Sequence, residues 1–330
     1  MMEITVAKRE KMKIPILVTG VSGAGKTVSS LLIAKGIVEE MFPDLSDQEQ
    51  WLKIAVIDTE HNRSKYYADS EIDGSKIGEF LHADFEPPYN AFELEKGVIE
   101  LKQRGVEVIV LDSLTHLWSG DGGIQSQVDS INSKKRSGNN MTAWSDVKPE
   151  IDKLFSLITN SSVFFICTAR SKTGYDMEKN DKGKIVPVKV GLKPEIRDGW
   201  EFEFAINFSI NQDHIADVTK DNTNLFKSSA VINEFVGQQI YRWASEGLDI
   251  AALKNELIDK IEQLTPTTEL RKAKFKGVFA AMRKAPLADW PLSYLKTMVD
   301  QLSSLPDHDS EPAELPNIDE AAETVGNAFA

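Results

Sequence analysis

The chain has 330 residues, of which 41% are hydrophobic and 27% are charged, and its formal net charge is −13. This composition is typical of a soluble globular protein and excludes a fibrous or wholly disordered one, and the length predicts one large domain plus a smaller one because a single core stops growing near about 250 to 300 residues. No apolar run approaches the roughly 18 residues of a membrane span, and the first residues lack the apolar core of a signal peptide, so we expect a cytoplasmic protein with no membrane partner.

The first predicted strand, Ile14–Thr19, and the first predicted helix, Val28–Met41, flank a glycine-rich segment. That segment fits the pattern G-x-x-x-x-G-K-[ST] in full, which marks a phosphate-binding loop when a strand precedes it and a helix follows it. In such a loop, backbone N–H groups surround the phosphates, the lysine reaches the terminal phosphates and the hydroxyl joins the Mg²⁺ shell. We therefore predict a nucleotide triphosphate with Mg²⁺, bound by Gly20, Ser22, Gly23, Ala24, Gly25, Lys26, Thr27 and Val28.

The second predicted strand, Ile54–Asp58, leads into a carboxylate at Glu60. If this strand lies beside the phosphate-loop strand, its carboxyl end faces the crevice where open α/β sheets bind ligands. Glu60 is then a candidate for the base that orients water in hydrolysis. The alternative is that Glu60 caps the segment that follows it, because a glutamate at a strand end is common.

An amphipathic helix is predicted over residues 90–104, and the strand Val106–Asp112 follows it. Its last residue, Asp112, is predicted to hold the water shell of Mg²⁺ together with Thr27. In many ATPases a glutamate comes directly after this aspartate, whereas a serine and a leucine follow here. The base must therefore come from elsewhere, which favours Glu60.

A helix over residues 143–160 and the apolar strand Val163–Thr168 come next. Continuous apolar strands separated by amphipathic helices predict an α/β fold with a mostly parallel central sheet. The expected loops over residues 133–140 and 172–193 are rich in cations, and clustered cations bind the phosphates of nucleic acid. The second loop also has acidic residues, so a merely solvated loop is an equal alternative. The residues predicted to contact nucleic acid are Lys134, Lys135, Arg136 and Lys172.

The rest of the chain changes from strands to helices. Short strands are predicted over residues 202–210, 214–219 and 229–232, and helices over residues 250–264, 268–284 and 291–302. The end of the chain carries seven acidic residues and no lysine or arginine after residue 305, which predicts disorder. We therefore expect a nucleotide-binding domain over residues 1–247, a helical domain over residues 248–305 and an acidic disordered tail over residues 306–330.

The segments Ile57–His61 and Val110–Ser113, which follow the phosphate loop, together resemble the nucleotide core of RecA. The resemblance implies that Glu60, which belongs to a D-x-E-H element, activates water. It also implies ATP as the nucleotide, because a tyrosine seven residues beyond that glutamate stacks on adenine in RecA and Tyr67 has the matching position. The chain departs from the RecA pattern at Ser64, where RecA has an aspartate near the adenine.

A closer resemblance, over about residues 12–245, is to phage-encoded RecA-like proteins grouped among the AAA-type ATPases, some of which act in single-strand annealing and recombination. Residues 112–116 and 218–223 carry it. The resemblance implies a ring or filament in which Lys220 reaches the neighbour's γ-phosphate, although Asn222 stands where such proteins have a second cation. It also implies that Arg170 senses the γ-phosphate. A solvated turn lysine and a surface ion-pair arginine are the respective alternatives.

Three function classes follow from these features. The first is an ATP-hydrolysing protein that acts on single-stranded DNA in phage-type recombination, annealing or replication, in a bacterial or phage-infected cell. The second is a nucleotide-gated interaction protein with slow or no hydrolysis, whose protein partner binds the helical domain or the acidic tail. The third is a small-molecule phosphotransferase, which ranks last because no lid-like arginine cluster follows the core.

Overall fold

A computed structural model of the chain describes residues 6–134, 140–179, 185–281 and 284–307. It forms two compact units. One consists of residues 12–246, and the other groups residues 6–11 with the described residues from 247 onward. Most of the tail expected to be disordered lies outside the described residues, and the domain limits expected from the sequence stay a prediction.

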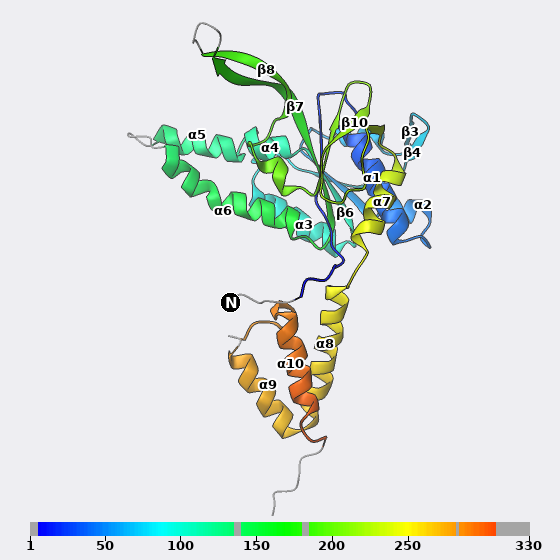
Figure 1. The fold of residues 1–330 in the computed structure, drawn as a ribbon, viewed down its shortest axis with the longest axis vertical. Coiled ribbons are helices and arrows are strands. Elements are labelled where there is room, and N and C mark those ends of the chain that lie inside the picture. The colour runs from blue at the N-terminus through cyan, green and yellow to red at the C-terminus, as the bar shows by residue number, and fades with distance from the viewer. Residues whose placement is uncertain (1–5, 135–139, 180–184, 282–283, 308–330) are drawn as a thin grey trace, which may run out of the picture. The chain divides into compact units, whose positions relative to one another are not determined.

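The larger unit is built on a twisted central sheet (Figure 1). The strand order is β11-β10-β9-β1-β7-β6-β2-β5, and β8 pairs with β7 off this path. The strands from β9 to β5 in this order run parallel, whereas β8, β10 and β11 pair antiparallel to their neighbours. The strand limits are Ile16–Gly20 for β1, Ile54–Asp58 for β2, Leu81–Asp84 for β5, Val108–Asp112 for β6, Phe164–Lys179 for β7, Ile185–Pro194 for β8, Ile206–Ile210 for β9, Ile215–Asp221 for β10 and Ala230–Val231 for β11. This arrangement confirms the predicted α/β class and the mostly parallel sheet.

Helices cover both faces of the sheet, which is why β1, β2 and β6 are buried along their whole length. On one face, α1 (Lys26–Met41), α2 (Asp47–Trp51) and α7 (Glu234–Ala244) enclose one apolar core. On the other face, α3 (Ala91–Gln103), α4 (Leu114–Ser119), α5 (Ile124–Lys134) and α6 (Asn140–Thr159) enclose a second. Gly36 of α1 and Gly237 of α7 let these two helices pack backbone against backbone, because a Cβ on either would overlap a carbonyl oxygen of the other helix.

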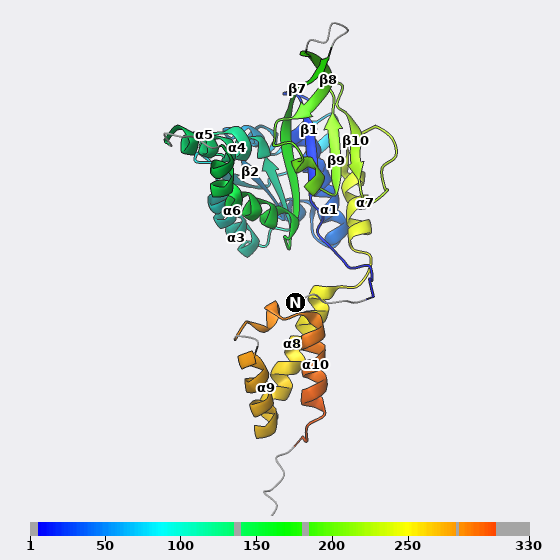
Figure 2. The ribbon, with the colours of Figure 1, turned by 60° about the vertical axis from the view of Figure 1, so that its left-hand side comes forward.

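The structure corrects three sequence-based expectations. Strand β2 does not lie beside β1, because β7 and β6 lie between them. Residues 172–179 and 185–193, expected to belong to a loop, are parts of β7 and β8, which form a hairpin that extends beyond the sheet (Figure 2). The expected strand from residue 202 begins only at Ile206, because Trp200–Glu203 form a 3₁₀ turn, η2.

The sequence analysis also missed several short elements before α3. The 3₁₀ turn η1 (Arg63–Tyr67) and the two-stranded sheet of β3 (Ser70–Ile72) and β4 (Ser75–Ile77) follow β2. Strand β5 then forms an edge of the main sheet beside β2. These pieces are three to five residues long, too short for a hydrophobic period to stand out.

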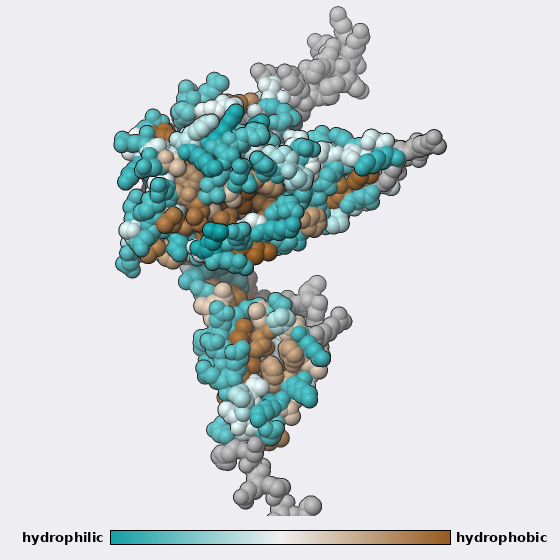
Figure 3. Space-filling view, turned by 180° about the vertical axis from the view of Figure 1, so that it is seen from behind, coloured by the Kyte–Doolittle hydropathy of each residue, from teal (hydrophilic) through white to brown (hydrophobic). Residues whose placement is uncertain are grey.

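The smaller unit is a three-helix assembly of α8 (Ile250–Leu264), α9 (Glu269–Ala281) and α10 (Leu292–Ser303). Its core is made of Leu257, Ile261, Trp290, Leu295, Met298 and Leu302. The buried guanidinium of Arg271 donates to the carbonyl oxygens of Leu302 and Leu305, which fixes the end of α10. Hydrophobic residues of this unit lie between hydrophilic ones on the face shown in Figure 3. Within the ranges described, no helix of either unit is long and apolar enough to cross a membrane.

Candidate active site

A cavity of about 540 Å³ opens above the predicted phosphate loop, at the carboxyl end of the parallel strands. We call it the loop cavity. The loop enters it with Gly23 and Gly25 in the left-handed region, at φ 82° and 88°, where a glycine is strongly favoured. Residues from six segments line it, namely Ser22, Gly23, Gly25, Lys26, Thr27, Val28, Ser29 and Leu32 of the loop and α1, Glu60, Arg63 and Tyr67 after β2, Ile72, Asp73 and Ser75 of the β3–β4 pair, Asp112 of β6, His214 before β10, and Val231, Ile232 and Asn233 before α7.

Lys26 lies at the floor of the loop cavity. Its Nζ donates to the carbonyl oxygen of Val21, 3.0 Å away, within the same loop. Burial lowers the pKa of the Lys26 ammonium, and the carboxylates of Asp112 and Glu60 oppose that shift. The lysine is therefore held by its own loop, and an anion in the cavity would offer it a stronger partner than a neutral carbonyl.

Thr27 and Asp112 meet at the other side of the cavity. The Thr27 Oγ1 donates to Asp112 Oδ2 at 2.6 Å, and the Thr168 Oγ1 donates to Asp112 Oδ1 at 2.5 Å. Asp112 is only 4% exposed, and burial raises its pKa, with the charges of Glu60 and Asp58 adding to the shift. A buried carboxylate beside a hydroxyl is a set of hard oxygen donors. Because Mg²⁺ takes one or two such protein ligands and completes its shell with phosphate oxygens and water, this pair fits Mg²⁺.

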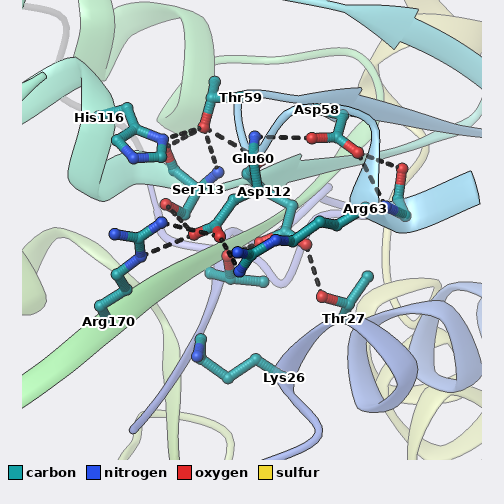
Figure 4. Close-up of polar contacts among 12 residues, drawn as sticks. Lys26, Thr27, Asp58, Thr59, Glu60, Arg63, Asp112, Ser113, His116 and Arg170 are labelled. Atoms are coloured by element: carbon teal, nitrogen blue, oxygen red, sulfur yellow. Dashed lines mark hydrogen bonds and ion pairs between the residues drawn. The ribbon is translucent and has the colours of Figure 1, made fainter. Parts of the chain in front are cut away.

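Glu60 lines the same cavity although β2 is not adjacent to β1, because the carboxyl ends of parallel strands lie at one edge of a sheet. Figure 4 shows Glu60 with Arg170 and the other polar residues of the site. Arg170 of β7 forms a two-point ion pair with the Glu60 carboxylate. Its Nε lies 2.8 Å from Oε1, and its Nη2 lies 2.8 Å from Oε2. Burial by itself would raise the pKa of Glu60, but the hydrogen bonds and charge of Arg170 outweigh it, and the net shift is downward. Glu60 is thus an ionised carboxylate at the cavity.

A buried polar network ties the end of β2 to the end of β6. The Oγ1 of Thr59 accepts the Ser113 backbone N–H at 2.7 Å and lies 2.7 Å from Nδ1 of His116. The His116 ring stacks on Tyr89, with centroids 5.3 Å apart. Burial, helped by the charge of Arg170, lowers the pKa of His116, which favours the neutral ring. The network therefore fixes the backbone at Thr59, directly before Glu60.

Tyr67 of η1 also lines the loop cavity. Ile72 of β3 and Ile232, which lies just before α7, add apolar side chains to the lining of this cavity. Ser64 does not line it: it is buried, and both its N–H and its hydroxyl donate to Asp58, at 2.9 and 2.6 Å. The departure from RecA at this position thus places a structural serine where RecA has an aspartate.

His214 is a cavity residue that the sequence analysis missed. His214 lies in the turn between β9 and β10 at φ 61°, and its Nδ1 lies 3.1 Å from the carbonyl oxygen of Ala24. A Cβ on Gly25 would come within 3.0 Å of that ring nitrogen. Only the folded chain brings this turn onto the phosphate loop, so no local pattern pointed to it.

The remaining predicted site residues lie away from the loop cavity. The Nζ of Lys220 donates to the carbonyl oxygens of Phe202 and Phe204, at 2.5 Å each, so its role across a subunit boundary stays a prediction. Lys172 is exposed on β7 and pairs with Glu195 at 3.1 Å. Lys134 is exposed at the end of α5, and Lys135 and Arg136 lie outside the described residues.

Comparison with known proteins agrees with this geometry. A family model described as "AAA domain" matches residues 12–210. The match runs from the strand before the phosphate loop to the end of β9, and it therefore includes Lys26, Glu60, Asp112 and Arg170. A search of curated proteins found no match to the chain.

Proposed function

Because this chain belongs to the AAA domain family of P-loop ATPases, we propose that it hydrolyses ATP and uses the cycle to control its binding to single-stranded DNA. One observation carries the first half of the proposal. The loop cavity brings together a lysine for phosphates, an oxygen pair suited to Mg²⁺ and an ionised carboxylate for water, namely Lys26, Thr27 with Asp112, and Glu60.

In the proposed reaction, Lys26 exchanges the carbonyl of Val21 for oxygens of the β- and γ-phosphates. Arg170 leaves Glu60 for the γ-phosphate, and the freed carboxylate accepts a hydrogen bond from water. The water oxygen then bonds to the γ-phosphorus while Glu60 takes its proton. The bond from the γ-phosphorus to the bridging oxygen breaks, and ADP leaves with that electron pair. Mg²⁺ held by Thr27 and Asp112 would neutralise charge on the phosphates.

The second half of the proposal rests on the β7–β8 hairpin. Its residues 172–193 contain six lysines against three acidic residues, in a chain that is strongly acidic overall. The hairpin extends from the sheet (Figure 2), which gives a polymer strand an elongated surface to lie along. Exposed cations neutralise strand phosphates without regard to sequence. We propose phage-type recombination, annealing or replication as the setting, and a ring or filament as the assembly.

A second candidate function is a nucleotide-gated switch for a protein partner with slow or no hydrolysis. Two observations favour it. Arg170 occupies Glu60 through both carboxylate oxygens, and Asn222 replaces the second cation expected beside Lys220. Both would slow turnover and leave the bound nucleotide as a lasting signal.

ATP turnover measured with and without single-stranded DNA tests the proposal. Glu60→Gln should keep ATP binding and lower turnover about a hundredfold or more, whereas Lys26→Ala should abolish ATP binding. His61→Gln, at the exposed next residue, is the matched control and should behave as the parent does. If both variants turn over ATP like the parent, the assignment of the site is wrong. Slow turnover that DNA does not change would favour the switch, and phosphate transfer to a metabolite would favour a phosphotransferase.

A further inference from the structure

A second cavity, of about 390 Å³, lies on the sheet face that faces away from α1, and we call it the sheet cavity. Asn207 and Ser209 of β9 line it, whereas Ile206 and Phe208 between them point into the core under α1. Leu192 of β8 also lines it, so the cavity lies at the foot of the β7–β8 hairpin. It shares no lining residue with the loop cavity.

Asn207 contributes a buried polar side chain to the wall of the sheet cavity. The residue is 4% exposed, and its Nδ2 donates to the carbonyl oxygen of Glu201 at 2.7 Å. That bond fixes the orientation of the amide and leaves Oδ1 buried, with no hydrogen-bond partner among the described residues. An unpaired buried acceptor costs about 1 to 3 kcal/mol. Asn207 lines the cavity, so a ligand there that displaces the atoms covering Oδ1 would supply the missing hydrogen bond.

The other walls suit a flat ring. Phe202 of η2 lines the cavity and is 70% exposed, and Leu192 is 51% exposed. Hydroxyl groups of Ser209 and Thr219 add small polar contacts at the same wall as Asn207. A cavity of this size, apolar with a few convergent polar groups, falls in the usual range of about 300 to 1,000 Å³ for sites that hold small organic groups.

We propose that the sheet cavity takes one base of a single strand held along the β7–β8 hairpin, stacked against Phe202 and donating an N–H to Asn207 Oδ1. The proposal rests on the DNA-binding function proposed above. Single-strand recognition uses these same two elements, a ring face for stacking and an amide for the edge of the base. A side chain from a second copy of the chain is the competing occupant. The base is favoured because the cavity continues from the lysine-rich hairpin, where a strand would already lie.

The test compares binding of a single-stranded oligonucleotide with binding of the same sugar–phosphate strand without bases, by fluorescence anisotropy. The parent protein should prefer the strand with bases by about tenfold, which is the size of one stacking contact. Asn207→Leu and Phe202→Ala should each remove most of this preference and leave the salt dependence of binding unchanged. Asn160→Leu, the same change at an exposed asparagine after α6, is the control and should keep the preference. Phe202→Ala changes an exposed side chain, so its result stands even if Asn207→Leu fails to fold.

Equal binding of both strands by the parent protein would overturn the base cavity and leave DNA binding intact. Binding of neither strand would overturn the proposed DNA function, and the base cavity with it. If the two variants change self-association in the absence of DNA and keep the preference for bases, the cavity belongs to a second copy of the chain, and the proposal is wrong.

Discussion

Arg170 binds Glu60 through two nitrogens of its guanidinium, Nε and Nη2, each 2.8 Å from one carboxylate oxygen. These are the two residues for which we propose the roles of γ-phosphate sensor and general base. While they are paired, each carboxylate oxygen of Glu60 accepts a hydrogen bond from Arg170, which lowers the pKa of Glu60 and weakens it as a base. A γ-phosphate competes for the guanidinium because it also offers two oxygens in one plane. The pair is therefore expected to couple nucleotide binding to release of the base.

Arg170→Ala should raise the pKa of Glu60, because burial would then act without the opposing guanidinium. The base has to be ionised, so the acid limb of the pH profile of ATP hydrolysis should move to higher pH. Turnover at neutral pH should fall about tenfold or more, because the γ-phosphate also loses a cation. Arg63→Ala is the matched control, since Arg63 lies 3.5 Å from the same carboxylate but is exposed. An acid limb that stays in place in Arg170→Ala would show that Arg170 does not set the ionisation of Glu60.

Asp112→Asn should stabilise the nucleotide-free protein. Burial raises the pKa of Asp112 in the folded state. Below the ordinary pKa of an aspartate, Asp112 is protonated in both the folded and the unfolded state, and the substitution should change the stability little. As the pH rises from that ordinary pKa to the raised pKa of Asp112 in the folded state, the unfolded state loses its proton first. The parent protein therefore loses stability over this range. Above this window the variant should be more stable by about 1 kcal/mol or more.

Urea unfolding of Asp112→Asn over a series of pH values measures this difference. The new amide can still accept a hydrogen bond from one of the two threonine hydroxyls, Thr27 or Thr168, and donate one to the other. Both hydrogen bonds of residue 112 are therefore kept. Asp121→Asn, at an exposed aspartate, should show no such window. Mg²⁺ with ATP should stabilise the parent more than Asp112→Asn. The interpretation fails if Asp112→Asn is the less stable protein at neutral pH.

Gly237→Ala should destabilise the larger unit, because its Cβ would overlap the carbonyl oxygen of Ile33 in α1. Relief of the overlap requires the two helices to separate, and the free energy of unfolding should fall by about 1 to 3 kcal/mol. Gly97→Ala in α3 is the matched control, because nothing lies within 4 Å of its Cβ position. That substitution should raise the free energy of unfolding by about 0.5 to 1 kcal/mol. Equal stability of both variants in urea would contradict the close packing of α1 and α7.

The parts of the site that local sequence specifies were predictable. A glycine-rich loop between a strand and a helix places Lys26 and Thr27 whatever the rest of the chain does. The aspartate that ends an apolar strand places Asp112 at the same sheet edge. Strand order does not follow from such patterns, because it depends on pairings between distant segments. The expected adjacency of the strand before Glu60 to the phosphate-loop strand was wrong for this reason.

The β7–β8 hairpin shows why other parts were not predictable. Lysines and glycines interrupt residues 172–193, and they hid an alternation that ordinarily predicts strands. The pairing of β7 with β8 shifts register between Gly174 and Tyr175, which breaks the pattern further. The approach of His214 to the phosphate loop likewise depends on where the β9–β10 turn lies in the folded sheet. Neither feature has a signal within a short window of sequence.

Tyr67→Ala should weaken ATP binding more than it slows turnover. Tyr67 lines the loop cavity, and burial, with the charge of Asp112, raises the pKa of its hydroxyl, so the ring is neutral. If adenine stacks on this ring, its loss should raise the KM for ATP about tenfold, because stacking of a base on an aromatic side chain contributes about 1 to 3 kcal/mol. Tyr67→Phe keeps the ring and should keep the KM. Tyr66→Ala is the matched control, because the neighbouring ring is 77% exposed and does not line the cavity. Steady-state kinetics over a range of ATP concentrations measures the KM of each variant. An unchanged KM in Tyr67→Ala would place the adenine elsewhere.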